Sequence, residues 1–451
     1  MTSPARLTVA KDTVESFLLK LGLYGVAFVG SALISRALGP EGRGIYYFPV
    51  VAAATLVSVA KLGIEQANVY LLGTARVGPG RLSEQNGLVA LVMGTIAFLA
   101  LLVAPAIFPS LFSGTPIVLL VLAGLAIPFS LHTQFTTGLM TMIGQVTWQF
   151  SAGLIAGTAQ VAVIVALYFA GAITPQAVLA TSLLSITLTW LLVVAKFRVE
   201  GNPWLRWDPG LLGSTLRQSL PLHVGMVFFY FHFRADAFLV KLISGTTALG
   251  LYSVSVMLAE TMYLAMDSLA VALLPHQVGN KPQEAAHNAL RAGRVIVIVG
   301  GCVALLWVVL GLPIIRYLLG NDFLPAYVPM VILLPGLLAL GVQRVCGPPI
   351  LRQGRPLRMA LIYALGLGVN VVLNLLLIPL WGIAGAATSS AISYSLGALV
   401  FLVWTAAIAG APWWKGVLPK GEDARLLWLA AGELVSSIRS TASKPSGGSP
   451  P

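Results

Sequence analysis

A stripe of basic and aromatic side chains in the predicted helix 215–243 is the first group of residues that could do chemistry. His223, Tyr230, Arg234 and Lys241 fall within about 40° of one another when residues are placed about 100° apart. A guanidinium binds phosphate through two parallel hydrogen bonds, and aromatic rings stack on sugar rings. The stripe therefore predicts a site for an anionic ligand that contains rings.

Carboxylates lie near this stripe in the sequence. Asp236 is on the opposite face of the same predicted helix, where it could pair with a neighbouring helix. Glu260 and Asp267 share one face of the predicted helix 247–275. These two acids could carry a coupling proton or cation, or they could neutralise Arg234 or Arg344.

Other charges fall inside predicted apolar helices. Lys61 and Glu65 have the i, i+4 spacing at which opposite charges pair on a helix. Lys20 lies on the same face as Tyr24, and it could instead extend its charge to the membrane surface. A charge at mid-membrane costs about 2.5–3.5 kcal/mol on insertion scales, so charges that persist there usually face a bundle interior.

The candidate residues divide by charge. The candidate substrate-cavity residues are Lys20, Tyr24, Lys61, His223, Tyr230, Arg234, Lys241 and Arg344. The candidate ion-coupling or charge-balancing residues are Glu65, Asp236, Glu260 and Asp267. His132, Gln134 and Thr136 are polar enough to line a cavity, and Asn370 and Asn374 are expected to hydrogen-bond between helices.

The elements that hold these residues must be membrane helices. Of the 451 residues, 57% are hydrophobic and 9% are charged, against about 25% charged in a typical soluble domain. No Asp, Glu, Lys or Arg occurs between Glu84 and Lys196, or between Arg358 and Lys415. Since a membrane helix needs about 20 apolar residues, these runs hold several spans, and they are too long and too apolar for the strands of a β-barrel.

Gly, Pro and Asn turns divide the apolar sequence into twelve predicted spans. The fold class is therefore all-α and polytopic. The predicted spans are 14–38, 45–72, 85–109, 115–142, 150–172, 175–197, 215–243, 247–275, 293–319, 326–351, 357–380 and 383–409.

The distribution of Lys and Arg predicts the orientation. With the N-terminus in the cytoplasm, nineteen of the 27 basic residues fall on the cytoplasmic side, four at the outer side and four within spans. The net charge of +12 is thus mostly a topology signal, and nucleic acid is not an expected partner. We expect an inner-membrane protein with both termini in the cytoplasm.

Two short matches indicate an internal repeat. Gly44-Ile45-Tyr46 matches Gly250-Leu251-Tyr252, and Ala180-Thr181-Ser182 matches Ala387-Thr388-Ser389 at nearly the same offset. We predict two six-helix lobes at 1–198 and 215–410, joined by an interfacial cytoplasmic linker at 199–214 and followed by a partly disordered cytoplasmic tail at 411–451. An even number of helices in each copy predicts a twofold axis along the membrane normal, with the substrate site between the lobes.

Enzymatic chemistry finds little support. The sequence has no P-loop and no nucleophile–base motif, and Cys302 and Cys346 both lie in apolar segments. Every predicted outer loop is too short for the acidic loops of lipid-dependent glycosyltransferases. We expect neither a metal nor a cofactor, and we expect no enzymatic activity.

Three segments resemble a known family. Residues 33–72 resemble the opening of prokaryotic polysaccharide exporters, and 234–252 resembles the start of their second lobe. Segment 368–394, GVNVVLNLLLIPLWGIAGAATSSAISY, is the strongest match. Together they resemble the O-antigen and exopolysaccharide flippases of the multidrug/oligosaccharidyl-lipid/polysaccharide exporter superfamily.

This resemblance implies a V-shaped bundle with a central cavity and alternating access. It also implies an undecaprenyl-pyrophosphate-linked oligosaccharide as the substrate, with membrane lipid and possible polymerase and chain-length-regulator proteins as partners. An ion-coupled multidrug or metabolite antiporter of the same superfamily is the alternative. A membrane scaffold without transport is a third reading, but the sequence has no long domain or loop to support it.

Overall fold

The computed structural model describes residues 3–74, 77–199, 208–273, 281–354 and 356–423, and these residues contain helices and turns but no strand. Residues 200–207 of the predicted linker and residues 424–451 of the predicted tail lie outside this description. The helices are α1 (Ser3–Ala60), α2 (Ile64–Gly73), α3 (Pro79–Ile107), α4 (Pro109–Phe112), α5 (Ile117–Leu125), α6 (Ile127–Met142), α7 (Val146–Phe169), α8 (Pro175–Val199), α9 (Pro209–Leu273), α10 (Pro282–Ile314), α11 (Tyr327–Leu351) and α12 (Pro356–Ala409), with short helical turns at Ile315–Leu319, Asn321–Ala326 and Trp413–Gly416.

Nine helices in the described residues are long and apolar enough to cross a membrane. Three of the nine, α1, α9 and α12, each bend at one glycine of positive φ, namely Gly39, Gly245 and Gly382. Each bend divides its helix into two membrane-length segments, so the described chain holds the twelve spans that the sequence predicts. The protein is an all-α polytopic membrane protein.

The distribution of side chains fits a lipid environment. Large apolar residues such as Leu305 and Leu380 are exposed, at 65% and 71% of their surface, while Asn68, Asn370 and Ser390 are fully buried. Every polar group within a bilayer needs a partner inside the protein. Lipid therefore covers the apolar exterior, and the polar residues bond to one another inside.

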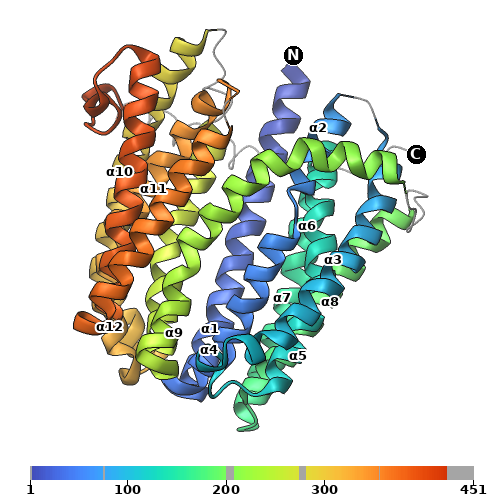
Figure 1. Ribbon diagram of the computed structural model, residues 1–451, viewed down its shortest axis with the longest axis vertical. Coiled ribbons are helices and arrows are strands. Elements are labelled where there is room, and N and C mark those ends of the chain that lie inside the picture. Colours follow the sequence, from blue (N-terminus) through green and yellow to red (C-terminus); the bar gives the residue numbers. More distant parts are fainter. Residues whose placement is uncertain (1–2, 75–76, 200–207, 274–280, 355, 424–451) are drawn as a thin grey trace, which may run out of the picture. The chain divides into compact units, whose positions relative to one another are not determined.

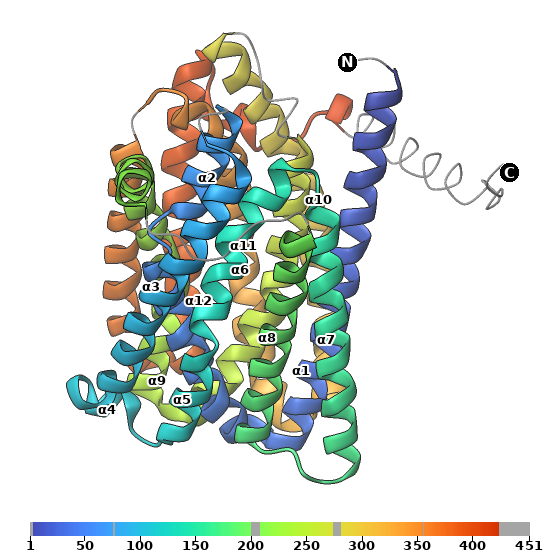
Figure 2. The same ribbon diagram turned by 90° about the vertical axis from the view of Figure 1, so that its right-hand side faces the viewer.

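The described chain forms two compact units. Unit 1 comprises residues 1–259, 308–333 and 356–393, and unit 2 comprises residues 260–307, 334–355 and 394–451. Within unit 1, α7 packs along α1 and α8, and α6 packs against α2 and α3 (Figure 2). The predicted division into two six-helix lobes stays a prediction.

Several helix boundaries differ from those predicted; α1 begins at Ser3, α3 begins at Pro79, and the predicted helix 115–142 is divided into α5 and α6. α9 begins at Pro209, inside the predicted linker, and α10 begins at Pro282, before the predicted start at residue 293. The predicted helix 45–72 is wrong as a single helix, because α1 ends at Ala60 and α2 begins at Ile64. Gly63 adopts a left-handed conformation that ends the first helix, and this break lies at the candidate site.

Candidate functional site

The break between α1 and α2 places Lys61 at an interrupted membrane helix. Leu62 and Gly63 have φ angles of 51° and 70°, and most residues adopt such angles only under strain. A Cβ atom added to Gly63 would lie 3.0 Å from the Ser219 carbonyl oxygen and 3.0 Å from His223 Cβ. Only glycine therefore allows both this turn and the close approach of α9.

Side chains of α9 satisfy the carbonyl groups that the break releases. Ser219 Oγ donates a hydrogen bond to the Leu62 carbonyl at 2.7 Å, and His223 Nε2 lies 3.0 Å from the Val59 carbonyl oxygen. Without water, an unpaired carbonyl in a membrane costs several kcal/mol. The side chains of α9 thus stabilise the helix break, and His223 is one of them.

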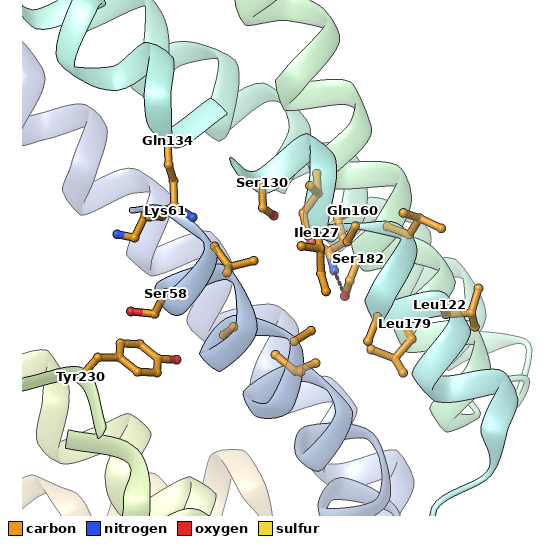
Figure 3. A pocket seen from close by; sticks show the side chains of 18 residues that line it. Ser58, Lys61, Leu122, Ile127, Ser130, Gln134, Gln160, Leu179, Ser182 and Tyr230 are labelled. Atoms are coloured by element: carbon orange, nitrogen blue, oxygen red, sulfur yellow. Dashed lines mark hydrogen bonds between the residues drawn. The ribbon is translucent and has the colours of Figure 1, made fainter. Parts of the chain in front are cut away.

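A pocket of about 480 Å³ opens beside the break, within unit 1 (Figure 3). Small-molecule sites are commonly about 300–1,000 Å³ in volume. Its lining residues come from α1, α5, α6, α7, α8 and α9, from the break after α1 and from the junction of α5 and α6. They are Val50, Ala53, Ala54, Val57, Ser58, Lys61, Leu122, Ala123, Ala126, Ile127, Ser130, Gln134, Gln160, Leu179, Ser182, Leu183, Ile186 and Tyr230.

The polar groups of the pocket are almost all uncharged. Gln160 Nε2 donates to Ser182 Oγ at 2.9 Å, and Figure 3 shows this pair apart from Lys61, with Tyr230 reaching in from α9. None of the lining residues, all of which lie in the described part of the chain, is Asp or Glu. Lys61 is the single charged lining residue, and its Nζ lies 3.2 Å from Glu65 Oε1.

The predicted stripe on α9 divides between different places. Tyr230 lines the pocket, and His223 supports the helix break. Lys241 is buried, with its Nζ donating to the Ser113 carbonyl at 3.1 Å. The guanidinium carbon of Arg234 lies 4.9 Å from the centre of the Phe233 ring. Helical spacing places these residues on one face of α9. The groups that this face contacts change along the helix, because different neighbouring segments pack against it.

Lys20 and Tyr24, on the first half of α1, are not among the pocket residues. The Lys20 ammonium lies 5.1 Å from the centre of the Phe150 ring on α7, a cation–π distance. Tyr24 is 42% exposed. Their roles in a substrate cavity stay predictions.

Asp236 is the most buried of the predicted carboxylates in unit 1. Its oxygens accept hydrogen bonds from Tyr252 Oη at 2.6 Å, from Ser390 Oγ at 3.0 Å and from the Ala237 backbone N–H at 2.7 Å. The network continues through Asn370, which donates to Ser390 Oγ at 3.2 Å. Asp236 thus joins both halves of α9 to α12 through uncharged donors.

Of the two asparagines of α12, Asn370 bonds across the Gly382 bend, whereas Asn374 bonds within its own helical segment. Asn370 Nδ2 also donates to Ser393 Oγ at 3.1 Å, and Asn374 Nδ2 donates to Asn370 Oδ1 at 2.9 Å. Both asparagines are fully buried. The interhelical hydrogen bonds predicted for Asn370 are confirmed.

The acids of the second half of α9 belong to unit 2. Arg344 Nε donates to Asp267 Oδ1 at 2.8 Å, with 53% of the Arg344 side chain and 31% of the Asp267 side chain exposed. Asp267 therefore neutralises Arg344, which is one of the two roles that the sequence analysis left open for this acid. Glu260 also lies in unit 2, and neither Glu260 nor Arg344 is among the residues that line the pocket in unit 1.

Several site residues escaped the sequence analysis. Ser58, Ser130, Gln160 and Ser182 line the pocket, and only the Ala-Thr-Ser repeat had drawn attention to one of them. Of the three polar residues predicted on α6, Gln134 lines the pocket, whereas the buried His132 accepts a hydrogen bond from Trp190 Nε1 at 2.8 Å. A single Gln or Ser in an apolar helix carries no pattern that would mark it.

Comparisons with known proteins give a family and a fold. Residues 9–277 match the family described as polysaccharide biosynthesis protein, and no curated protein sequence matches the chain significantly. The solved structure of the lipid II flippase MurJ, in an inward closed conformation, is similar with a TM-score of 0.66 at 14% identity, over 96% of this chain and 94% of that one.

Multidrug transporters have a similar fold. A MATE transporter from Vibrio cholerae has a TM-score of 0.65 at 13% identity, over 92% of this chain and 100% of that one. An inward-facing multidrug resistance MATE family transporter of the MOP superfamily has a TM-score of 0.64 at 15% identity, over 88% and 98% of the two chains. At these identities the likeness establishes the shared fold.

Proposed function

Because the chain belongs to the polysaccharide biosynthesis protein family, we propose that it is a flippase for an undecaprenyl-pyrophosphate-linked oligosaccharide. The family and the fold are those of membrane transporters and flippases. Besides this cargo, we propose that the protein lies in the inner membrane with both termini in the cytoplasm. The excess of Lys and Arg on one side of the predicted spans supports this orientation.

The composition of the pocket is the observation that carries the proposal. Hydroxyl and amide groups from Ser58, Gln134, Gln160 and Ser182 line it, together with the ring of Tyr230. Such groups donate to and accept from sugar hydroxyls, and an aromatic face stacks on a sugar ring. An organic cation would instead call for a carboxylate, and none of the lining residues supplies one.

The proposed cycle follows from these groups. The sugar headgroup enters the pocket from the cytoplasmic side while the lipid tail stays in the bilayer. Lys61, at the helix break, offers its ammonium to an anionic group of the headgroup in exchange for Glu65. Rocking of the two predicted lobes then exposes the headgroup on the outer side, where a polymerase and a chain-length regulator would receive it.

A deletion strain tests the cargo. Without the protein, the lipid-linked sugar should accumulate on the inner leaflet, and surface polysaccharide should fall at least tenfold. In the complemented strain, Lys61→Ala should lose most export and Lys61→Arg should retain part of it. Lys281→Ala, at an exposed lysine outside the pocket, is the matched control and should export normally. Unchanged export in the deletion strain would exclude this cargo.

The buried carboxylate of Asp236 favours a second candidate, an ion-coupled multidrug or metabolite antiporter. A membrane carboxylate held by uncharged donors is costly, and such residues commonly bind protons or cations. Proteoliposomes with an imposed proton or sodium gradient would test this function. Gradient-driven uptake of an organic cation that Asp236→Asn abolishes and Asp267→Asn leaves intact would favour the antiporter over the flippase.

A further inference from the structure

The predicted outer end of unit 1 carries two exposed arginines. Of the four basic residues that the sequence places at the outer side, Arg43 and Lys241 are buried, at 2% and 6% of their surface. The other two, Arg36 and Arg316, are exposed. The outer ends of membrane helices are normally poor in Lys and Arg. Two exposed arginines at this end therefore call for a reason.

Both arginines reach the same tyrosine. Arg36 is three residues before the Gly39 bend of α1, which lies at the end of unit 1 opposite the start of that helix (Figure 1). Its Nη2 donates to the Tyr317 carbonyl at 2.6 Å. The guanidinium carbon of Arg316 lies 5.9 Å from the centre of the Tyr317 ring, and Tyr317 is 67% exposed. Segments 281 residues apart thus bring two positive charges to one exposed aromatic residue.

An irregular helix end holds this group in place. Ile315–Leu319 is a π-helical turn, and the Gly320 N–H donates to the Ile315 carbonyl at 2.9 Å. Ile315 and Leu319 are buried, whereas the three residues between them are exposed. Such turns are rare and are frequently found at functional sites. The last carbonyls of a helix lack intrahelical donors, so Arg36 satisfies one of them and joins α1 to this turn.

The two guanidinium groups keep donors for a ligand. In the described part of the chain neither Arg36 nor Arg316 forms an ion pair, although Glu41 and Asp322 are also exposed at the predicted outer side. A guanidinium has five N–H donors, and one donor of Arg36 serves the Tyr317 carbonyl. Guanidinium groups bind phosphate through two parallel hydrogen bonds. The pair can therefore hold phosphate oxygens without breaking the contact between α1 and the turn.

The surroundings indicate the class of ligand. Leu312 and Leu318 lie on the same segment and are exposed at 44% and 45%, so they face acyl chains, since lipid covers the apolar exterior. A phospholipid diester carries a single negative charge, whereas a pyrophosphate carries more than one, which suits two arginines. The exposed ring of Tyr317 can stack on a sugar. A lipid whose pyrophosphate bears a sugar matches all of these groups.

We propose that Arg36, Arg316 and Tyr317 form an outer-leaflet subsite for the pyrophosphate and first sugar of the flipped lipid. The identity of this ligand rests on the proposed function. The subsite is separate from the pocket, because none of the three residues is among those that line it. The headgroup occupies it after leaving the pocket, while the lipid tail stays in the bilayer beside the exposed leucines. Binding here competes with return of the headgroup to the pocket.

A fluorescent label beside the arginines tests the subsite. The full-length protein with Cys302→Ser and Cys346→Ala carries the label at Leu318→Cys and is placed in phosphatidylcholine nanodiscs. Titration with undecaprenyl pyrophosphate should change the emission and reach saturation, and Arg316→Gln should raise the apparent Kd at least tenfold. Arg358→Gln, at an exposed arginine of the predicted cytoplasmic end, is the matched control and should leave the Kd unchanged.

Two other probes separate the sources of phosphate. Free inorganic pyrophosphate should bind at least tenfold more weakly than the lipid, because it makes no contact with the leucines or the bilayer. Phosphatidylglycerol should compete only when it is in large excess. Equal binding of free pyrophosphate would overturn the lipid ligand, and equal binding of phosphatidylglycerol would overturn the pyrophosphate and leave an ordinary anionic-lipid contact.

A conservative variant separates ligand binding from the contact that Arg36 makes with Tyr317. Arg36→Lys keeps a donor for the carbonyl but cannot form two parallel bonds to phosphate. It should keep the thermal unfolding midpoint and lose at least fivefold in affinity for undecaprenyl pyrophosphate. Unchanged affinity in Arg36→Lys, or in Arg316→Gln with a normal unfolding midpoint, would overturn the subsite.

The titration also separates this subsite from the proposed cargo. It measures binding at the outer end without any transport, whereas the deletion strain measures export. Specific binding of undecaprenyl pyrophosphate that depends on Arg316 would support the subsite even if export were unchanged in the deletion strain. Absence of such binding would overturn the subsite even if export were lost.

Discussion

The two compact units handle buried charge differently. In unit 1, Arg43 donates to hydroxyl groups and Asp236 accepts from hydroxyl and backbone donors. In unit 2, Arg294 and Asp423 form a direct ion pair through two hydrogen bonds of 2.6 and 2.8 Å. An ion pair satisfies both charges where they lie, whereas a charge held by hydroxyl groups keeps the capacity to exchange partners.

The buried charges have different roles in the two units. The Arg294–Asp423 pair joins α10 to the residues after α12, and Arg294 also donates to the Lys415 carbonyl at 3.0 Å. Gly293 supports this contact, since a Cβ atom there would lie 2.6 Å from the Gly416 carbonyl oxygen. Unit 2 thus uses this buried ion pair to hold α10 against the residues after α12, while unit 1 holds Arg43 and Asp236 through hydrogen bonds to uncharged groups.

The largest effect should come from breaking the unit 2 pair. Arg294→Ala leaves the carboxylate of Asp423 buried and unpaired, which should lower the free energy of unfolding by about 3 kcal/mol. Thermal unfolding of the purified protein in detergent measures the change. Arg358→Ala, at an exposed arginine, should change stability by less than about 0.5 kcal/mol. Equal effects of the two variants would remove the contrast between the units.

A backbone substitution tests the helix break of unit 1. Gly63→Ala forces a side chain into a left-handed conformation and against the backbone of α9, which should cost about 2 kcal/mol. Gly78→Ala is the control, because Gly78 has a φ of −74° and no atom lies within 4 Å of its added Cβ. The same unfolding assay compares them. If the two variants had equal unfolding free energies, the break would not depend on a glycine at position 63.

Exposure should separate the Arg344–Asp267 pair from the Arg294–Asp423 pair of the same unit. The Arg344–Asp267 pair is partly open to solvent, and exposed pairs typically contribute about 0.2–1 kcal/mol. Asp267→Asn should therefore lower the unfolding free energy by less than about 1 kcal/mol, well below the effect of Arg294→Ala. A loss as large as that of Arg294→Ala would mean that Arg344 is buried in the membrane-embedded protein.

The pH dependence of the unit 2 pair is the smallest effect. Burial raises the pKa of the Asp423 carboxyl, but hydrogen bonds from Arg294 and the Lys420 backbone N–H, together with the charges of Arg294 and Arg291, hold it below its ordinary value. A carboxyl whose pKa is lowered on folding stabilises the protein above its unfolded pKa and loses this effect as the pH falls. The stability difference between the parent and Arg294→Ala should thus stay constant from about pH 8 to 5 and shrink below about pH 4. A difference that shrank already near neutral pH would contradict this assignment.

The sequence by itself determined the membrane spans and most of their ends. Long apolar runs can only be buried in lipid, and Gly39, Gly245 and Gly382 mark bends because only glycine adopts their backbone angles freely. The repeated Gly-x-Tyr motif also marks Gly44 and Gly250 in the sequence. These features depend on local chemistry, which is readable from a few neighbouring residues.

Only the tertiary structure decided which polar residues share a site. The break at Gly63 needs Ser219 and His223, more than 150 residues away, and no local pattern distinguishes it from a continuous helix. Gln160 and Ser182 meet because α7 and α8 pack with one particular rotation. Periodicity gives the face on which a residue lies, but the rotation and register of packed helices come from many weak contacts over the whole bundle.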